Sequence, residues 1–346
     1  MKKSLLAVAV LGAFAGAASA QSSVTLFGVV DLSANQIKNG ATTAKYLASN
    51  QLNSNRLGFR GVEDLGGGLT AGFWLEAGMN NASGMAGGGS GNVAPTDAAS
   101  SQLFNRRSTV SLISKMGEVR LGRDYDPSFW NTVFFDVDGA NGLGQGLNLI
   151  SSLGSGATSI ARTNNSIAYF LPGGLGGLYG QFQVAAPEGQ PGNNYRGGRV
   201  GWAAGPVDVA VAYAITKTAG NDFKMENVGA SYDFGVVKLL GYYNRNTFGL
   251  LKQNVYEVSG SVPLGQGEFR ATYGKADASG GGTDANDAKL ASVEYIYNLS
   301  KRTALYTTYA RITNSGKAAF SILPGSLGSA AGAQSSGYNF GVRHSF

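Results

Sequence analysis

Side chains suited to catalysis or metal binding are scarce in this chain. Its 346 residues include no cysteine and a single histidine, His344. Disulfides and thiolate metal sites are therefore excluded, and neither a Ser-His-Asp triad nor a multi-histidine zinc site is expected. Asp277, Asp284 and Asp287 lie close together, but their spacing does not match an EF-hand loop. We expect a protein that is not an enzyme and that needs no metal or cofactor.

The composition indicates a folded protein with an unusual balance of residue types. Only 14% of the residues are charged and 53 are glycine, whereas soluble domains carry about 25% charged residues. The Gly-X-Y period of collagen is absent, and 8 prolines are too few for a proline-rich disordered chain. The formal net charge of +6 is a mild excess that does not suggest a nucleic acid partner.

The N-terminus has the pattern of a cleaved signal peptide. Lys2 and Lys3 precede an apolar stretch from 5 to 15, and Ala18-Ser19-Ala20 is a small-x-small cleavage site. The apolar stretch is shorter than the ~20 residues that a membrane-spanning helix needs. We therefore expect residues 1–20 to direct export to the periplasm and residues 21–346 to form a single domain.

The rest of the chain alternates between apolar and polar or small residues. Val207, Val209, Val211 and Tyr213 are interleaved with small residues, and the same period of two recurs up to the C-terminal Phe346. Such alternation indicates β-strands with one apolar face. No later stretch approaches 18 consecutive apolar residues, so helical membrane spans are not expected. The fold class is therefore all-β.

Turn signals divide the chain into sixteen such segments, of which the first two cover roughly 23–36 and 53–63. Tight turns alternate with longer polar, glycine-rich connections, namely 81–102, 126–163, 187–195, 279–287 and 315–335. This pattern is typical of outer-membrane β-barrels, and an even strand number places both termini at the short-turn end. A soluble β-sandwich or propeller is the alternative, but the second face of the strands is too polar and small to pack against another sheet.

Four segments together resemble the general diffusion porins of Gram-negative bacteria, especially the beta-proteobacterial branch. They are SVTLFGVVD at 23–31, NRLGFRGVEDLG at 55–66, LGRDY at 121–125 and GVRHSF at 341–346. The resemblance implies a 16-stranded antiparallel transmembrane β-barrel in the outer membrane, with short periplasmic turns, long extracellular loops and three barrels per homotrimer. It also implies that Phe346 is the aromatic C-terminal signal for barrel assembly.

The resemblance further implies that the long connection 126–163 folds into the barrel and narrows it. This connection carries Asp136 and Asp138 together with Phe129, Trp130, Phe134 and Phe135. The aromatic side chains can wedge the loop against the wall while a carboxylate faces the opening. Asp136 and Asp138 can equally be solvated or capping residues of the loop.

Opposite this loop the family carries basic side chains on the wall, and the matching positions here are Arg56, Arg106 and Arg162. Alternation supports Arg56, because Leu57 then faces lipid and Arg56 faces inward. An outward arginine near the middle of the membrane would cost roughly 2–4 kcal/mol. Arg106 is ambiguous, because Arg107 follows it and alternation allows only one of the two to face the lumen.

The function that follows is passive diffusion of ions and small hydrophilic solutes, with a preference for anions because basic groups exceed acids. A substrate-specific sugar channel is the alternative. Such channels use a row of lumenal aromatics, whereas Phe27, Trp74 and Tyr179 are scattered on the inward face. The expected partners are outer-membrane lipid and lipopolysaccharide, which acidic loop residues can bind through cations, and no nucleic acid.

Overall fold

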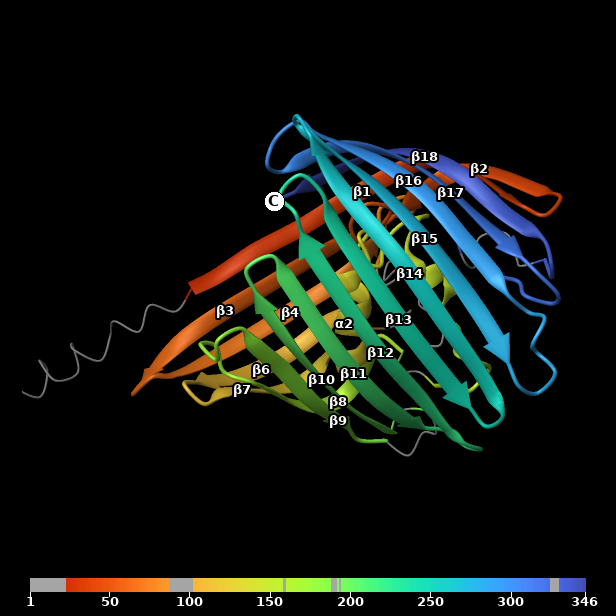
Figure 1. The fold of residues 1–346 in the computed structure, drawn as a ribbon. Helices are drawn as coiled ribbons and strands as arrows, with labels where there is room; N and C mark the ends of the chain where they lie inside the picture. The colour runs from red at the N-terminus through yellow and green to blue at the C-terminus, as the bar shows by residue number, and fades with distance from the viewer. Residues whose placement is uncertain (1–22, 87–101, 158–159, 188–191, 193, 324–329) are drawn as a thin grey trace, which may run out of the picture.

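The computed structural model describes residues 23–346 apart from 87–101, 158–159, 188–191, 193 and 324–329. The expected signal peptide, residues 1–20, lies outside these described residues. Within them the chain forms one barrel of long, tilted strands that encloses one α-helix (Figure 1).

The strands are β1 (Ser23–Asn39), β2 (Thr42–Ser49), β3 (Arg56–Gly66), β4 (Leu69–Asn80), β5 (Met85–Ala86), β6 (Arg107–Ser114), β7 (Gly117–Tyr125), β8 (Arg162–Phe170), β9 (Leu178–Ala185), β10 (Asn194–Ala204), β11 (Val207–Lys217), β12 (Asp222–Asp233), β13 (Lys238–Phe248), β14 (Leu251–Leu264), β15 (Gly267–Ser279), β16 (Ala288–Asn298), β17 (Thr303–Asn314) and β18 (Gln334–Ser345). The helix α2 (Pro127–Phe135) and the 3-10 helix η1 (Gly146–Leu149) both lie between β7 and β8.

The first and last strands pair and close the sheet into a barrel. β1 and β18 are antiparallel from Val29↔Ser345 to Asn39↔Ser335, and Gly28 and Phe346 exchange backbone hydrogen bonds of 3.0 and 3.1 Å. The described residues form 18 strands. β2 and β3 pair with successive parts of β1 and together count as one strand of the wall. Among the described strands, β5 pairs only with the end of β4 and does not count toward the wall. The wall is therefore a closed 16-strand antiparallel barrel, as the sequence predicts.

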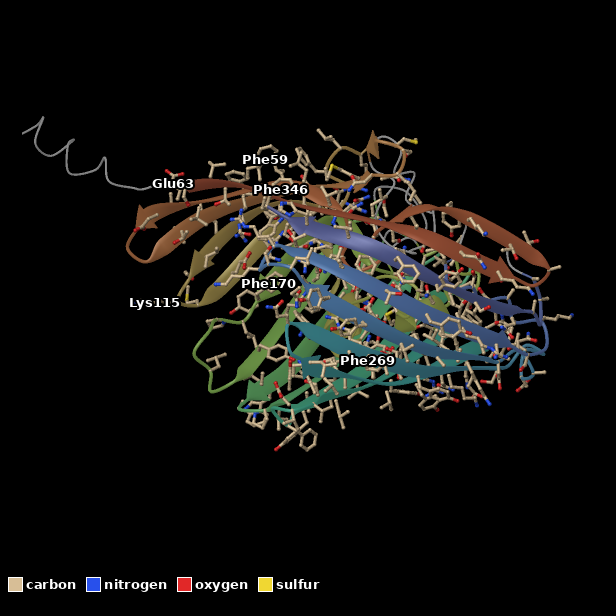
Figure 2. The ribbon with its side chains drawn as sticks, turned by 90° about the horizontal axis from the view of Figure 1, so that it is seen from above. Phe59, Glu63, Lys115, Phe170, Phe269 and Phe346 are labelled. Atoms are coloured by element: carbon tan, nitrogen blue, oxygen red, sulfur yellow. The ribbon has the colours of Figure 1, made fainter. Side chains whose placement is uncertain are left out.

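The two ends of the barrel differ as expected. Tight turns such as Gly205-Pro206 and Gly265-Gln266 join strands at one end, which we call the short-turn end. Both the start of β1 and Phe346 lie there, and Figure 2 shows Glu63 and Lys115 at the same end. The segments 126–161, described apart from 158–159, and 315–323 leave the wall at the opposite end.

Alternation along the strands separates an apolar outer face from a polar and small inner face. Val209, Val211 and Tyr213 are 39%, 50% and 46% exposed on the outside, whereas Ala210 and Ala212 between them are buried. In a bilayer the outer side chains contact hydrocarbon, and every strand N–H and C=O must be bonded within the sheet. No helix in the described part of the chain is long and apolar enough to cross a membrane.

Small inner residues make room for the segment 126–161, which fills part of the lumen. Asp126 caps α2 by accepting a 2.8 Å hydrogen bond from the N–H of Phe129. At the other end of α2, Phe135 is fully buried against Ala210 and Tyr242. Its ring occupies the place where Gly229 of β12 lacks a side chain, since a Cβ atom there would overlap the ring. Of the four aromatic residues predicted to wedge the loop, Phe135 packs against the wall in this way, whereas Phe134 is 48% exposed.

A second hydrophobic cluster joins this segment to the wall and to the last long connection. Leu143, Leu149, Leu290, Ile312 and Ile322 are all fully buried there. The side-chain amide of Asn148 also donates a 3.0 Å hydrogen bond to the carbonyl of Ile322. Two of the long connections are thus packed on each other inside the barrel.

The stretch 50–55 between β2 and β3 also turns inward, which the sequence did not predict. The carboxylate of Asp31 accepts hydrogen bonds from the N–H groups of Leu52 at 2.7 Å and Asn53 at 2.6 Å. Ser54 then reaches the 126–161 segment through a 2.6 Å bond to Asn141. The strands predicted from the sequence at 23–36 and 53–63 miss β2, which lies between them. The sequence of β2, TTAKYLAS, shows only a weak alternation of apolar and polar residues.

The packing of Phe135 against Gly229 can be tested by adding a side chain at Gly229. Gly229→Val should collide with the Phe135 ring and destabilise the protein by about 1–3 kcal/mol, the usual cost of overpacking a core. Gly241→Val is the matched control, because a Cβ atom there meets nothing within 4 Å. Thermal unfolding in detergent, followed by circular dichroism, should show a lower midpoint for Gly229→Val only. Equal midpoints would show that α2 is not seated against Gly229.

Candidate functional site

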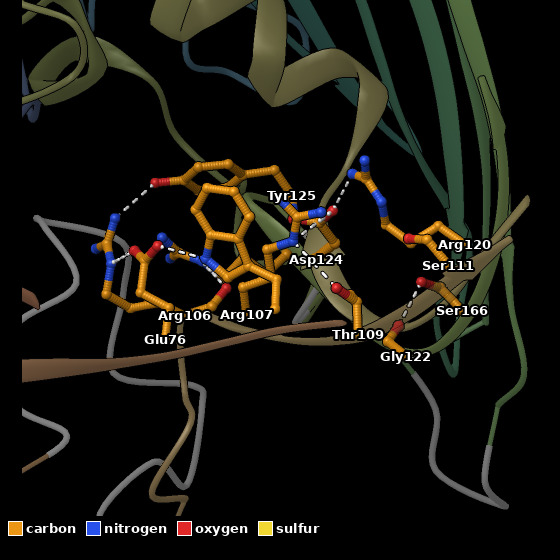
Figure 3. A network of polar contacts seen from close by, with 12 residues as sticks. Glu76, Arg106, Arg107, Thr109, Ser111, Arg120, Gly122, Asp124, Tyr125 and Ser166 are labelled. Atoms are coloured by element: carbon orange, nitrogen blue, oxygen red, sulfur yellow. Dashed lines mark hydrogen bonds and ion pairs between the residues drawn. The ribbon is translucent and has the colours of Figure 1, made fainter. Parts of the chain in front are cut away.

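Three arginines lie close together on the inner wall, and two of them contact one carboxylate. Arg106 donates a 2.5 Å hydrogen bond to Glu76 of β4, and Arg56 lies 3.4 Å from the same oxygen. Arg106 also donates to the hydroxyl of Tyr125 at 3.1 Å (Figure 3). Arg162 stacks on the Tyr125 ring at 4.1 Å and donates a 2.9 Å bond to the carbonyl of Arg106. The three arginines predicted from the sequence are therefore neighbours.

The three guanidinium groups differ in their access to the lumen. The side chain of Arg56 is 27% exposed, whereas that of Arg106 is 2% exposed. Arg162 is also buried. Three positive charges share one negative charge, Glu76, so the group keeps a net positive charge. We call these four residues with Tyr125 the arginine cluster.

Both Arg106 and Arg107 lie on the lumen side, so the expectation that only one can do so is wrong. Arg107 is the first residue of β6 and lies 3.5 Å from Asp124 and 4.4 Å from the Trp74 ring centroid. Arg106 precedes the strand and is therefore not bound by its alternation. Its N–H bonds the carbonyl of Glu76 at 3.1 Å, which directs its side chain inward as well.

The acidic residues across the lumen have different surroundings. The carboxylate of Asp136 accepts hydrogen bonds from the N–H groups of Asp138, Ala140 and Gly146 at 2.9, 3.3 and 3.1 Å. This geometry fits the alternative in which Asp136 is a capping residue that holds the loop in shape. Asp138 is 7% exposed, and one of its oxygens has no hydrogen-bond partner within the described residues.

Burial shifts the titration of both loop acids. It raises the pKa of Asp136 to about 6, although the three backbone N–H bonds and the positive charge of Arg270 oppose the shift. Burial also raises the pKa of Asp138 well above its usual range, and the carboxylates of Glu294 and Asp136 raise it further. Both acids therefore lose negative charge at a higher pH than exposed carboxylates do.

A cavity of about 440 Å³ separates the loop from the wall at this level. Its charged lining residues are Arg56, Arg270, Arg343, Asp138 and Glu268. Arg270 is held by an ion pair with Glu268 and lies 3.4 Å from Glu294. Arg56 from the wall and Asp138 from the loop thus line one cavity, and arginines outnumber the carboxylates in its lining.

Sequence reasoning missed Glu76, Tyr125, Arg270 and Arg343 as members of this region. Glu76 shares the inward parity of Trp74, whose indole N–H donates to it at 3.0 Å, so alternation alone could have pointed to it. Arg270 and Arg343 are inward on β15 and β18, but nothing in their local sequence indicates that the loop lies opposite them.

The terminal Phe346 lies apart from this region, at the short-turn end. It is 44% exposed, and its ring covers the outer face of Gly28, where a Cβ atom would overlap it. Figure 2 shows Phe346 near Phe59 on the outside of the barrel.

Comparison with known proteins relates the whole chain to one family. Residues 7–317 match the family model described as Gram-negative porin. Outer membrane porin protein 32 of Delftia acidovorans is 39% identical over 369 residues, covering 100% of both chains. An outer membrane porin protein of Bordetella pertussis is 32% identical, covering 90% of this chain and 94% of its own.

The solved anion-selective porin from Comamonas acidovorans has a TM-score of 0.80 and 33% identity, covering 94% of this chain and 100% of that one. These relatives are channels rather than enzymes.

The role of Glu76 in the arginine cluster can be tested through stability. Removing one partner of a buried ion pair leaves an uncompensated charge, so Glu76→Gln should destabilise the barrel by about 3 kcal/mol. Glu63→Gln, at an exposed position of the short-turn end, is the control. Urea unfolding of both variants in detergent measures the difference. A Glu76→Gln midpoint equal to that of the parent would contradict the ion pairing described here.

Proposed function

The chain belongs to the Gram-negative porin family and is an outer-membrane porin, and we propose that it is a passive diffusion channel that prefers anions. Its solutes are ions and small hydrophilic molecules that cross the cavity between the loop 126–161 and the wall. The observation that carries the anion preference is the arginine cluster, in which three guanidinium groups face one carboxylate.

The mechanism is electrostatic. An ion that crosses the 440 Å³ cavity passes Arg56 at a distance shorter than the ~8 Å Debye length at physiological salt. The low-dielectric protein walls focus the field of the fixed charges into the opening. Anions are therefore concentrated there and cations are depleted, without a binding step tight enough to slow transport.

The residues have separate parts in this proposal. Arg56 is the exposed charge that anions meet. Arg106 and Arg162 are buried behind it and add to its field, while Glu76 and Tyr125 hold them in place. Asp138 is the acidic side chain on the loop side of the cavity, where its raised pKa weakens its negative charge. Asp136 maintains the loop conformation through its three backbone hydrogen bonds. The similarity of this chain to the anion-selective porin from Comamonas acidovorans supports the same sign of preference.

We propose that export and assembly follow the family pattern. Residues 1–20 serve as a cleaved signal peptide, and Phe346 serves as the assembly signal at the periplasmic end. The barrel associates as a homotrimer in contact with outer-membrane lipid and lipopolysaccharide. The support is the signal-like sequence at the N-terminus and the exposed position of Phe346 on the outer face.

Planar-bilayer recording in a salt gradient tests the proposed function. The parent channel should show ohmic, unsaturated conductance and a reversal potential of the sign given by anion preference. Arg56→Gln should lower the anion-to-cation permeability ratio, with a larger effect at low salt because screening is weaker. Changing Arg162 as well should lower it further. Arg311→Gln, on the exposed outer face, should leave the ratio unchanged.

An Arg56→Gln ratio equal to that of the parent at low salt would contradict the role given to Arg56. Saturable block by one oligosaccharide would instead support a substrate-specific sugar channel.

Selectivity should also depend on pH. Asp136, with a pKa of about 6, is mostly charged at pH 7 and mostly neutral at pH 5, whereas exposed aspartates, with pKa values near 3.9, stay charged at both. Acidification from pH 7 to pH 5 therefore removes negative charge from the loop and should raise the anion-to-cation ratio. The shift should be smaller in Asp136→Asn. His344→Gln, which removes the single histidine, should retain it, and a parent ratio that falls on acidification would overturn this explanation.

A further inference from the structure

A second cavity, of about 390 Å³, lies on the inner wall between the arginine cluster and the short-turn end. Its lining comes from β1, β3, β4, β6 and β7 and includes Ser23, the first residue of β1. It also includes Ile113, which precedes the tight turn between β6 and β7. We call it the vestibule cavity.

Three arginines of the vestibule cavity are stacked on aromatic rings. Arg60 lies 5.4 Å from the Phe27 ring centroid and 5.1 Å from that of Trp74. Arg107 lies 4.4 Å from the Trp74 ring, and Arg120 lies 4.0 Å from the ring of Phe170. Stacking covers the face of a guanidinium plane and leaves its edge N–H groups to bind carboxylates or phosphates in a bidentate manner.

The charges of these arginines are only partly neutralised. Asp124 lies 3.5 Å from Arg107 and 2.5 Å from Arg120 (Figure 3). Arg120 also forms a 2.7 Å ion pair with Glu118. Arg60 has no carboxylate within ion-pair distance among the described residues, and it is exposed. The cavity therefore holds one arginine whose charge is available to a solute.

The remaining lining combines apolar side chains with the hydroxyl groups of Ser23, Thr25, Thr109 and Ser111. Val62 lies two positions after Arg60 on β3, so its side chain also faces the lumen, and it is 49% exposed. Ile113 is inward on β6, next to Gly72, and Trp74 lies between them and Arg107. Apolar surface facing the lumen does not stabilise bound chloride or phosphate. It stabilises a bound solute only when an apolar part of that solute covers it and removes both surfaces from water.

We propose that the vestibule cavity is a binding site for small carboxylates that carry an apolar body. The carboxylate pairs with the edge of Arg60, and the apolar body covers Val62, Ile113 and the rim of Trp74. This inference rests on the proposed function, because it names a class of anions that uses the channel. The site follows the arginine cluster along the lumen and retains such solutes briefly before they leave at the short-turn end.

Binding is tested on the trimer or monomer purified in detergent, with cyclohexanecarboxylate as the probe. Isothermal titration calorimetry should give saturable binding of cyclohexanecarboxylate. Acetate and inorganic phosphate, which lack an apolar body, and cyclohexanecarboxamide, which lacks the charge, should bind at least about tenfold more weakly. Equal affinity for phosphate or acetate would overturn the role of the apolar lining.

Two variants locate the site. Arg60→Gln should weaken cyclohexanecarboxylate binding about tenfold through loss of a charge-assisted hydrogen bond, and Arg60→Lys should have a smaller effect. Arg302→Gln, in the tight turn before β17, is the matched control and should bind like the parent. Tryptophan fluorescence should change on titration in the parent and not in Trp74→Phe, although Trp130 and Trp202 remain. Parental affinity in Arg60→Gln would overturn the site. A fluorescence change in Trp74→Phe as large as that of the parent would overturn it too.

The binding measurements are independent of conductance. If the channel prefers anions but cyclohexanecarboxylate does not bind, the vestibule site is wrong and the proposed function stands. If cyclohexanecarboxylate binds at Arg60 but the salt gradient shows no anion preference, the proposed function fails and the site remains.

Discussion

The pairing of β1 with β18 closes the sheet, and the arrangement of the wall and the lumen follows from this closure. In hydrocarbon, an unpaired strand edge leaves backbone N–H and C=O groups without partners, so only a closed barrel is stable there. Closure fixes which face of every strand meets lipid, and alternation then sends every second side chain inward. The polar and small residues on that inner face cannot exclude water by themselves.

The size of the opening is therefore set by three inward segments, namely 50–55, 126–161 and 315–323. Asp31 holds the first of them through hydrogen bonds. The packing of Phe135 against Gly229 and the hydrophobic cluster around Leu290 and Ile322 hold the other two.

The charges inside the barrel are arranged so that some are structural and others meet solutes. A buried guanidinium is costly without a partner, and Arg106 and Arg162 have partners in Glu76, Tyr125 and a backbone carbonyl. One carboxylate cannot neutralise three guanidinium groups, so a positive field remains where Arg56 reaches the cavity. On the loop side, the carboxylate of Asp136 accepts three backbone hydrogen bonds that hold the loop in shape. Burial raises the pKa of both Asp136 and Asp138, which weakens the negative charge that opposes the arginines.

The sequence predicts the features that depend on local pattern. Alternation predicts the all-β class and the inward direction of Arg56, and turn signals predict the tight turns, because each depends only on neighbouring residues. Resemblance adds Arg106, Arg162 and the inward loop. The inward stretch 50–55 was missed because its cause is Asp31, some twenty positions earlier in the chain. Arg270, Arg343 and the capping role of Asp136 depend on which wall faces the loop, which no local pattern records. Alternation did not predict that Arg106 and Arg107 both face the lumen, because Arg106 lies just before β6.

In the proposed channel, anions meet a net positive charge at Arg56 inside the barrel. Crystals of the protein soaked in bromide, with diffraction measured at the bromine absorption edge, show where anions gather. An anomalous peak should lie in the cavity against the guanidinium of Arg56, and it should be absent there in crystals of Arg56→Gln. Bromide found only on the outer loops, with a rubidium peak in the cavity in a parallel soak, would show that the cavity favours cations instead.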